Sequence, residues 1–96
     1  MKIRVTAKNY PQEVLRSETP VLVEFFAVWC GKCAMMEDVL DEIAKEYDGR
    51  VKVCQIEIEE SAVLAAEFEV GIVGNDYIYV GSTAKFETVN PALFEL

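Results

Sequence analysis

The sequence predicts an α/β fold, a three-layer α/β/α sandwich around a mixed sheet, built as a single domain over residues 1–96. Three observations predict it. Residues 21–28 hold seven apolar side chains in eight, which is typical of a strand buried on both faces inside a parallel sheet. An amphipathic helix pattern and a second strand follow, and this order forms a parallel βαβ unit. Two further strand patterns around Gly81-Ser82 predict an antiparallel hairpin, which makes the sheet mixed.

Composition and charge argue against several classes of protein. The net charge of −8 at pH 7 argues against a nucleic-acid partner, since such a surface needs a basic patch. No apolar run approaches the roughly 20 residues of a membrane-spanning helix. No long apolar segment follows Lys2, as a signal peptide requires. We therefore expect a cytoplasmic protein that does not engage a membrane.

The chain contains three cysteines and no histidine. A closed zinc site in one monomer normally needs four Cys or His ligands, and a Cys–His catalytic pair is excluded. An odd number of cysteines in a reducing compartment also argues against a scaffold of structural disulfides. What remains is a dithiol that forms a disulfide reversibly and needs no metal or cofactor of its own.

The first predicted elements are a short strand and a short helix. Residues 3–7 alternate apolar and polar side chains, which predicts a strand. Asn9 is expected to cap a helix over residues 10–17, with a glutamine three residues later completing a capping box. The side chains expected to face the core from this helix are Val14 and Leu15.

A long helix is predicted over residues 32–47, directly after the buried strand. It is expected to stop at Asp48-Gly49, where glycine supplies the left-handed exit from the helix. Its apolar side chains recur at helical spacing and form one inward stripe of Met36, Val39, Leu40, Ile43, Ala44 and Tyr47.

The second half begins with a strand over residues 51–59 and a helix through residues 62–68 that ends near Gly71. Ser61 is expected to cap this helix. Cys54 lies within the strand and is expected to be an inert packing residue, because free cysteines in core strands behave as small apolar side chains.

Residues 71–75 are predicted to form a loop, followed by strands over residues 77–80 and 84–89. A last helix starts at Pro91 and has room for only six residues, so the C-terminal helix is shortened. In the strand over residues 77–80, the rings of Tyr77 and Tyr79 are expected to pack against other side chains while their hydroxyls stay in water. Apolar side chains that would cover one sheet face thinly or favour self-association are Leu93, Phe94 and Leu96.

Trp29-Cys30-Gly31-Lys32-Cys33 lies where the buried strand gives way to the long helix. Free backbone N–H groups and the positive end of the helix dipole favour an anion at such a junction. A thiolate is an anion, so the pKa of Cys30 should be lowered from its usual value. The position itself therefore predicts redox chemistry.

These residues together resemble the thioredoxin family. The resemblance rests on residues 20–27, on the Trp-Cys-Gly-Lys-Cys motif at 29–33, and on residues 40–44 and 66–70 at the expected separations. A Cys-x-x-Cys pair alone is a weak signal, whereas Trp-Cys-Gly-x-Cys between such a strand and such a helix is a strong one. The resemblance covers about residues 5–90 and implies a thioredoxin fold.

The resemblance also implies a role for each residue of the motif. Cys30 would attack a substrate disulfide to form a mixed disulfide, and Cys33, one turn into the helix and more buried, would resolve it. Trp29 would pack beside the pair, and Gly31 would permit a tight turn. Lys32 stands where thioredoxins usually carry proline. Its positive charge would stabilise the Cys30 thiolate and raise the reduction potential of the pair.

Glu24 matches the buried acid of the family, usually an aspartate, that accepts a proton from the resolving cysteine. Its apolar neighbours in the strand favour this role over that of a solubilising surface charge. The family often has a lysine near this acid. Gln55 occupies that position here, a departure that bears on the strength of any proton relay.

The largest departure concerns the substrate groove. Val73-Gly74-Asn75 replaces the family's cis-proline and threonine, which face the disulfide and hold a substrate backbone. Gly74 does not enforce a cis bond, so we expect trans geometry and a looser groove. Asn90 stands where the family often has a glycine on the same surface.

The resemblance implies a thiol–disulfide oxidoreductase, an enzyme that reduces or exchanges disulfides of substrate proteins through Cys30 and Cys33. Its electrons would come from a flavoprotein disulfide reductase, and it would be a monomer or a weak homodimer. Two alternatives stay open. One is metal or iron–sulfur binding by Cys-x-x-Cys pairs across a dimer, which Gly74 makes less remote. The other is a non-catalytic module that binds protein partners.

Overall fold

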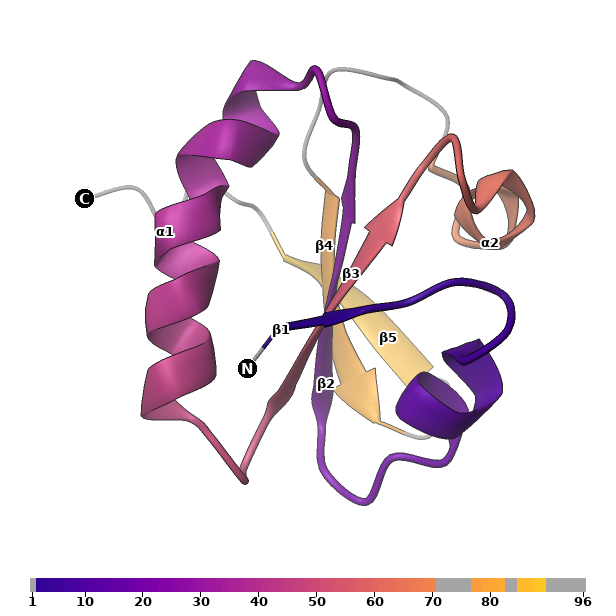
Figure 1. Cartoon of the computed structure of the whole chain (residues 1–96). Helices are drawn as coiled ribbons and strands as arrows, with labels where there is room; N and C mark the ends of the chain where they lie inside the picture. Colours follow the sequence, from indigo (N-terminus) through magenta and orange to yellow (C-terminus); the bar gives the residue numbers. More distant parts are fainter. Residues whose placement is uncertain (1, 71–76, 83–84, 90–96) are drawn as a thin grey trace.

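The computed structural model describes residues 2–70, 77–82 and 85–89, which form a five-stranded sheet in the order β1-β3-β2-β4-β5 (Figure 1). β1, β3 and β2 are parallel, and β4 is antiparallel to both of its neighbours, β2 and β5. The mixed sheet is therefore confirmed, with a parallel unit from the first half of the chain and a hairpin from the second. The strands are β1 Lys2–Arg4, β2 Val21–Phe26, β3 Lys52–Glu57, β4 Tyr77–Ser82 and β5 Lys85–Val89.

Helices cover both faces of the sheet (Figure 1). α1 (Gly31–Glu46) lies on one side, while α2 (Ala62–Glu67) and a short π-helix, η1 (Pro11–Leu15), lie on the other. Each side has its own cluster of buried apolar side chains. The predicted three-layer sandwich is confirmed for the described part of the chain. No helix among the described residues is both long enough and apolar enough to span a membrane.

β2 is the strand that the two cores share. Val23 and Phe25 belong to the core under η1 and α2, whereas Leu22 belongs to the core under α1. All three side chains are at most 4% exposed, which confirms a strand buried on both faces. β2 ends at Phe26 rather than at Val28, whose side chain is 77% exposed in the turn that follows.

Three aromatic rings from distant parts of the chain close the core under α2. The ring of Phe25 lies 4.9 Å from that of Phe68 and 5.8 Å from that of Tyr79, and the last two rings are 5.1 Å apart. These tilted and edge-on contacts suit aromatic pairs. The Tyr79 hydroxyl donates to the Phe68 carbonyl at 3.1 Å, so the prediction of a hydroxyl in water is wrong for Tyr79.

α1 presents most of its predicted stripe to the sheet. Tyr47 is the exception, since its side chain is 38% exposed and the Arg50 guanidinium lies 4.9 Å from its ring centre. Gly49 has φ of +81°, which confirms the left-handed exit. The buried members of the stripe are Met36, Leu40 and Ala44, and the partly buried ones are Val39 and Ile43.

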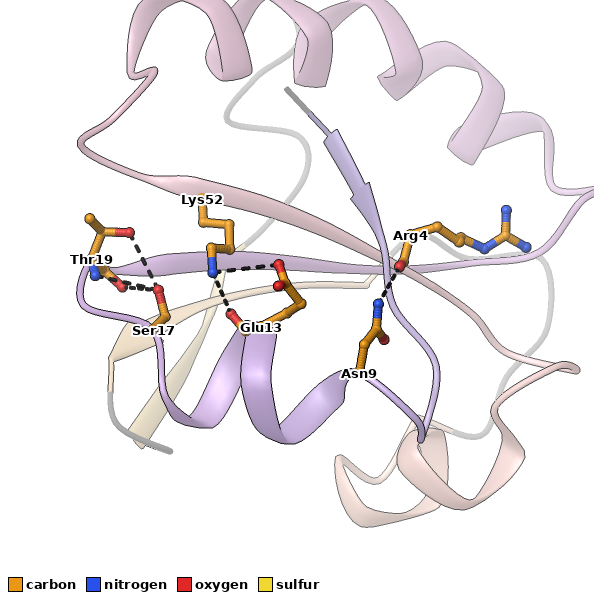
Figure 2. Close-up of polar contacts among 6 residues, drawn as sticks. All are labelled: Arg4, Asn9, Glu13, Ser17, Thr19 and Lys52. Carbon is orange, nitrogen blue, oxygen red and sulfur yellow. Dashed lines mark hydrogen bonds and ion pairs between the residues drawn. The ribbon is translucent and has the colours of Figure 1, made fainter.

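β1 is shorter than predicted, and the Asn9 side chain stabilises the loop that follows it. Asn9 Oδ1 accepts a hydrogen bond from the Thr6 N–H at 2.8 Å. The Asn9 Nδ2 donates to the Arg4 carbonyl at 3.0 Å (Figure 2). The side chain is therefore engaged outside the helix, and η1 has no side-chain cap. The predicted capping box is wrong.

η1 is attached to the sheet by one buried side chain and one lysine. Val14 is 1% exposed, but Leu15 is 40% exposed, so the prediction that Leu15 faces the core is wrong. Lys52 of β3 donates to the Glu13 carbonyl at 3.0 Å, and its ammonium lies 3.6 Å from the Glu13 carboxylate (Figure 2). These contacts hold η1 against the start of β3.

α2 begins after a turn that a glutamate closes. Glu57, the last residue of β3, is 6% exposed, and its Oε2 accepts a hydrogen bond from the Glu60 N–H at 2.5 Å. Ser61 occupies the N-cap position, but its side chain makes no capping hydrogen bond. Its hydroxyl is buried without a hydrogen-bond partner among the described residues, so the predicted cap is wrong.

Glu69, two residues after the end of α2, has left-handed backbone angles, with φ of +59°. The Glu69 N–H donates to the Ala66 carbonyl at 3.0 Å, and the Val70 N–H donates to the Ala65 carbonyl at 2.8 Å. This pair of bonds is a Schellman motif, in which glycine usually takes the left-handed position.

The antiparallel pairing predicted for the hairpin is confirmed by β4 and β5, but β4 is longer than predicted. β4 continues through Gly81 and Ser82, which pair with Phe86 and Lys85 of β5. Gly81 and Ser82 therefore belong to the strand, and the turn predicted at these two residues is wrong. The predicted loop over residues 71–75 and the predicted last helix lie outside the described residues.

Candidate active site

Cys30 and Cys33 form a disulfide at the N-terminus of α1. Cys30 is the N-cap residue with an extended backbone, and Cys33 lies in the first helical turn, with the two Cα atoms 5.2 Å apart. The Cys33 N–H donates a hydrogen bond to the Cys30 sulfur at 3.1 Å. The sulfur therefore takes the place that an N-cap oxygen has in other helices. The predicted position at a junction of strand and helix is confirmed.

Both cysteines of the disulfide are buried. Cys30 is 3% exposed and Cys33 is 4% exposed, and they cluster with Ala27 and the partly buried Phe26. The expectation that Cys33 is the more buried of the two is wrong for this disulfide form, because the bond holds both sulfurs in one apolar cluster.

Gly31 and Lys32 form the exposed first turn of α1. A Cβ atom on Gly31 would meet no atom within 4 Å, and Gly31 has no positive φ. Other residues adopt the same backbone, so neither the backbone angles nor the space around Gly31 require glycine at this position. Lys32 adds a positive charge to a helix end that already favours an anion, which is the physical basis of its predicted effect.

Trp29 is 60% exposed, and its indole Nε1 donates to Glu59 Oε1 at 3.1 Å. Glu59 follows β3, and Trp29 follows β2. These strands are parallel neighbours, so the residues after their carboxyl ends meet at one edge of the sheet. Sequence reasoning missed Glu59, although the predicted parallel pair of strands already implied that the residues after both strands lie near each other.

Glu24 is 1% exposed on the central strand, which confirms the predicted buried acid. Side chains two residues apart in a strand point to the same face of the sheet, so Glu24 lies on the same face as Phe26 and opposite to Phe25. Phe26 packs against the disulfide, and Glu24 therefore lies on the face of β2 that carries the disulfide cluster. Glu24 Oε1 accepts a hydrogen bond from Gln55 Nε2 at 2.9 Å. Glu24 Oε2 has no hydrogen-bond partner among the described residues.

Gln55 links the buried acid to the surface of α1. The same Nε2 also donates to Glu37 Oε2 at 3.4 Å, and Glu37 forms an ion pair with Lys2 of β1. Lys2 is 2.9 Å from Asp41 Oδ1. Sequence reasoning identified Gln55 as a departure from the family but missed Glu37 and Lys2, because the contacts of Glu37 with Gln55 and with Lys2 join residues that are far apart in the chain.

Arg4 lies over another member of the disulfide cluster. Its guanidinium is 4.9 Å from the ring centre of Phe26 and 3.5 Å from Glu60 Oε1. The cation–π contact joins β1 to β2, and the ion pair joins β1 to the turn after β3. Arg4 therefore stabilises the arrangement of the strand ends that carry the site.

Cys54 is a buried free thiol that does not belong to the disulfide site. It is 0% exposed on β3, and burial raises the pKa of its thiol to about 11. It is a free thiol that stays protonated at neutral pH, which agrees with the prediction of an inert packing residue.

Val73, Gly74 and Asn75, the predicted substrate groove, lie outside the described residues, as does Asn90. The roles predicted for them, and the trans geometry expected at Gly74, stay predictions. The part of the site that the structure describes comprises the disulfide, the buried acid with its glutamine, and the exposed tryptophan with its glutamate.

The comparisons with known proteins agree with this geometry. The family model named Thioredoxin matches residues 1–92. The chain is 40% identical over 78 residues to thioredoxin 1 of a Nostoc species, a match that covers 81% of this chain and 73% of the relative.

Two further relatives are matched over a smaller part of their length. A thioredoxin of Pseudomonas aeruginosa is 46% identical over 59 residues, which cover 62% of this chain and 55% of the relative. The chloroplastic thioredoxin M5 of Oryza sativa is 48% identical over 63 residues, which cover 66% of this chain and 37% of the relative. With a family match over nearly its whole length and a disulfide-forming Cys-x-x-Cys pair at the start of α1, the chain belongs to the thioredoxin family.

Proposed function

We propose that this protein is a thiol–disulfide oxidoreductase that reduces or exchanges disulfides of substrate proteins. The single observation that carries the proposal is the Cys30–Cys33 disulfide at the N-terminus of α1. A helix N-terminus stabilises a thiolate, and a disulfide between residues three apart can open and close without unwinding the helix. Membership of the thioredoxin family supports the same activity.

The reaction divides into two exchange steps. In the reduced protein, the Cys30 thiolate attacks one sulfur of the substrate disulfide, and the other substrate sulfur leaves as a thiolate. Cys33 then gives its thiol proton to the Glu24 carboxylate and attacks the Cys30 sulfur. The mixed disulfide breaks, the second substrate thiolate leaves, and the Cys30–Cys33 disulfide forms. The substrate gains two electrons and the protein loses two.

Exposed apolar side chains near the disulfide suit a protein substrate. Val28 and Trp29 directly precede Cys30 and are 77% and 60% exposed, and Met35 in the second turn of α1 is 69% exposed. A protein that covers them removes apolar surface from water as it brings its disulfide to Cys30. The groove predicted at Val73-Gly74-Asn75 would add backbone contacts to the same substrate.

The electron donor, compartment and assembly belong to the same proposal. A flavoprotein disulfide reductase would return two electrons to the Cys30–Cys33 disulfide. The free thiol of Cys54 is compatible with a reducing compartment such as the cytoplasm, where microscopy of a fluorescently tagged protein would detect it. We expect a monomer or a weak homodimer, which sedimentation over a range of concentrations measures.

The activity is tested by the reduction of a model protein disulfide with a chemical dithiol as electron source. Cys30→Ser should abolish catalysis, and Cys33→Ser should accumulate a mixed disulfide that mass spectrometry detects. Cys54→Ala is the matched control, because it removes a cysteine outside the site and should retain activity. Full activity of Cys30→Ser would contradict the proposal. A brown, iron-containing dimer after anaerobic purification would instead favour iron–sulfur binding.

A further inference from the structure

Two neighbouring acids after β3 lie at the edge of the sheet where the parallel strands β2 and β3 end. Glu60 Oε1 lies 3.5 Å from Nε of Arg4, and the Arg4 guanidinium lies 4.9 Å from the ring centre of Phe26. Glu59 Oε1 accepts a hydrogen bond from the indole Nε1 of Trp29 at 3.1 Å. Each acid is thereby associated with an aromatic side chain that comes from the end of β2 or from the turn after it.

Arg4 shows how this edge of the sheet binds a guanidinium. The Phe26 ring attracts the positive charge through its negative face, and the Glu60 carboxylate pairs with it. Trp29 and Glu59 offer the same two groups, and indole is the ring that attracts cations most strongly. Neither of these two residues contacts a cationic side chain among the described residues. A cation that binds them can therefore come from another protein.

We propose that Trp29 and Glu59 form a subsite for an arginine side chain of the substrate protein, beside the disulfide that is exchanged. The guanidinium stacks on the exposed indole ring and pairs with the Glu59 carboxylate. The role of this subsite in substrate recognition rests on the proposed function, whereas its ability to bind a guanidinium does not.

The subsite is accessible and is ordered before a substrate arrives. Trp29 is 60% exposed, and Glu59 is exposed as well. Their hydrogen bond fixes the ring relative to the carboxylate, so less conformational freedom is lost when a substrate binds. Trp29 directly precedes Cys30. A side chain bound to its ring therefore belongs to a substrate segment close to the attacked disulfide.

Arginine suits this pair of groups better than lysine does. The guanidinium is planar, stacks on aromatic faces and is more weakly hydrated than an ammonium group. The indole bond engages Oε1 of Glu59, and Oε2 makes no hydrogen bond among the described residues. The N–H groups of a stacked guanidinium can therefore donate to Oε2.

Lys32 limits where the substrate arginine lies. Lys32 is exposed in the first turn of α1, whereas Glu59 lies in the turn that leads to α2 on the opposite side of the sheet (Figure 1). Like charges repel, so an arginine is disfavoured over α1 and favoured on the side of Glu59. The two charges together orient a substrate on the disulfide.

The binding of a guanidinium is tested without any exchange reaction, by NMR of the full chain in its disulfide form. The chain has one tryptophan, so the indole N–H gives a single resonance. N-acetylarginine amide should shift this resonance with a dissociation constant at least about threefold lower than that of neutral N-acetylcitrulline amide. Glu59→Gln keeps an acceptor for the indole N–H but removes the charge, and it should shrink this difference by a factor of about two to five.

The role in exchange is tested with disulfide peptides that carry either arginine or citrulline, directly before or directly after one cysteine. A chemical dithiol supplies the electrons, and kcat/KM is measured for each peptide. In at least one of the two positions, the ratio of kcat/KM for arginine over citrulline should be about two to five times larger for the wild type than for Glu59→Gln. Comparison with the variant is needed because arginine also changes the intrinsic reactivity of the peptide disulfide.

Glu42→Gln is the matched control. It makes the same change of residue and charge on the exposed surface of α1, roughly 16 Å along the helix from its first residue. This separation exceeds the distance over which salt screens exposed charges. Glu42→Gln should therefore leave both the difference between the amides and the ratio between the peptides unchanged.

Equal dissociation constants of the two amides for the wild type would overturn the inference, as would equal effects of Glu59→Gln and Glu42→Gln. Binding of the arginine amide with no effect of Glu59→Gln on the kcat/KM ratio would overturn the role in substrate recognition. A wild-type protein that reduces neither peptide would contradict the proposed function. The NMR titration would still decide whether Trp29 and Glu59 bind a guanidinium.

Discussion

Cys30 and Cys54 show how the surroundings of a side chain decide what a thiol can do. The Cys30 sulfur accepts a backbone N–H at the start of a helix, where an anion is stabilised. Cys54 lies on β3 with no exposed surface, beside Val23 of β2, and burial raises the pKa of its thiol to about 11. At neutral pH one position suits a reactive thiolate, while the other keeps its thiol protonated and unreactive.

The buried Cys54 thiol should make stability fall at alkaline pH. Because folding raises its pKa from a usual 9.0 to about 11, its contribution is complete below pH 9 and is lost as the pH rises through 11. Between these values the wild-type protein should lose up to about 2 kcal/mol more unfolding free energy than Cys54→Ala. Urea unfolding at several pH values measures both slopes.

The cavity left by Cys54→Ala lowers stability at every pH, so the slopes, and not the absolute free energies, carry this test. Lys2 and Tyr10 also have raised pKa values, but they are present in both proteins and cancel in the comparison. Parallel slopes for the two proteins would show that Cys54 does not titrate as its burial implies.

Residues near each other in the chain were predictable, and contacts between distant residues were not. Glu24 was predicted as a buried acid from the resemblance to the family, and its apolar neighbours in the strand supported that prediction. The contacts of Trp29 with Glu59 and of Gln55 with Glu37 join residues 30 and 18 positions apart. They depend on strand register and on the orientation of α1, which no local pattern specifies.

At the scale of elements, the order of strands and helices was predictable, but several of their ends were not. Periodicity identifies an element along its whole length, whereas an end depends on one or two hydrogen bonds. Asn9 and Ser61 are residue types that often cap helices. The Asn9 amide instead bonds to the loop after β1, and the Ser61 hydroxyl is buried without a capping bond.

The end of α2 offers a stabilising substitution. Glu69 has φ of +59°, a conformation that costs a residue with a Cβ atom about 1 kcal/mol and costs glycine little. Glu69→Gly should therefore raise the unfolding free energy by about 0.5–1 kcal/mol in urea unfolding. Glu67→Gly, the same chemical change inside the helix, should lower it by about the same amount. Destabilisation by both variants would contradict this explanation.

At the scale of the whole molecule, β2 connects the two halves of the sheet and the two cores. It pairs with β3 of the first half and with β4 of the second, and its side chains enter the cores on both faces of the sheet. It also leads directly into the disulfide at the start of α1. A buried central strand was predictable from its apolar run. The strands that pair with β2 were less predictable from the sequence, because strand order depends on the packing of the entire sheet.

A shared central strand predicts that the two cores unfold together. Leu40→Ala empties space under α1 and Leu64→Ala under α2, and each should cost about 2–4 kcal/mol, because both side chains are at most 5% exposed. Trp29 fluorescence reports on the end of β2, and far-ultraviolet circular dichroism reports on all elements. The two signals should give coincident urea transitions in both variants, as a single cooperative unit requires.

Val63→Ala is the control for this last prediction, since Val63 lies in the same helix as Leu64 but is 72% exposed. It should change the unfolding free energy by less than about 0.5 kcal/mol. If Leu64→Ala caused the circular dichroism signal to change before the fluorescence of Trp29, α2 would unfold separately. The core under α2 would then not depend on β2 in the way that its packing against Val23 and Phe25 implies.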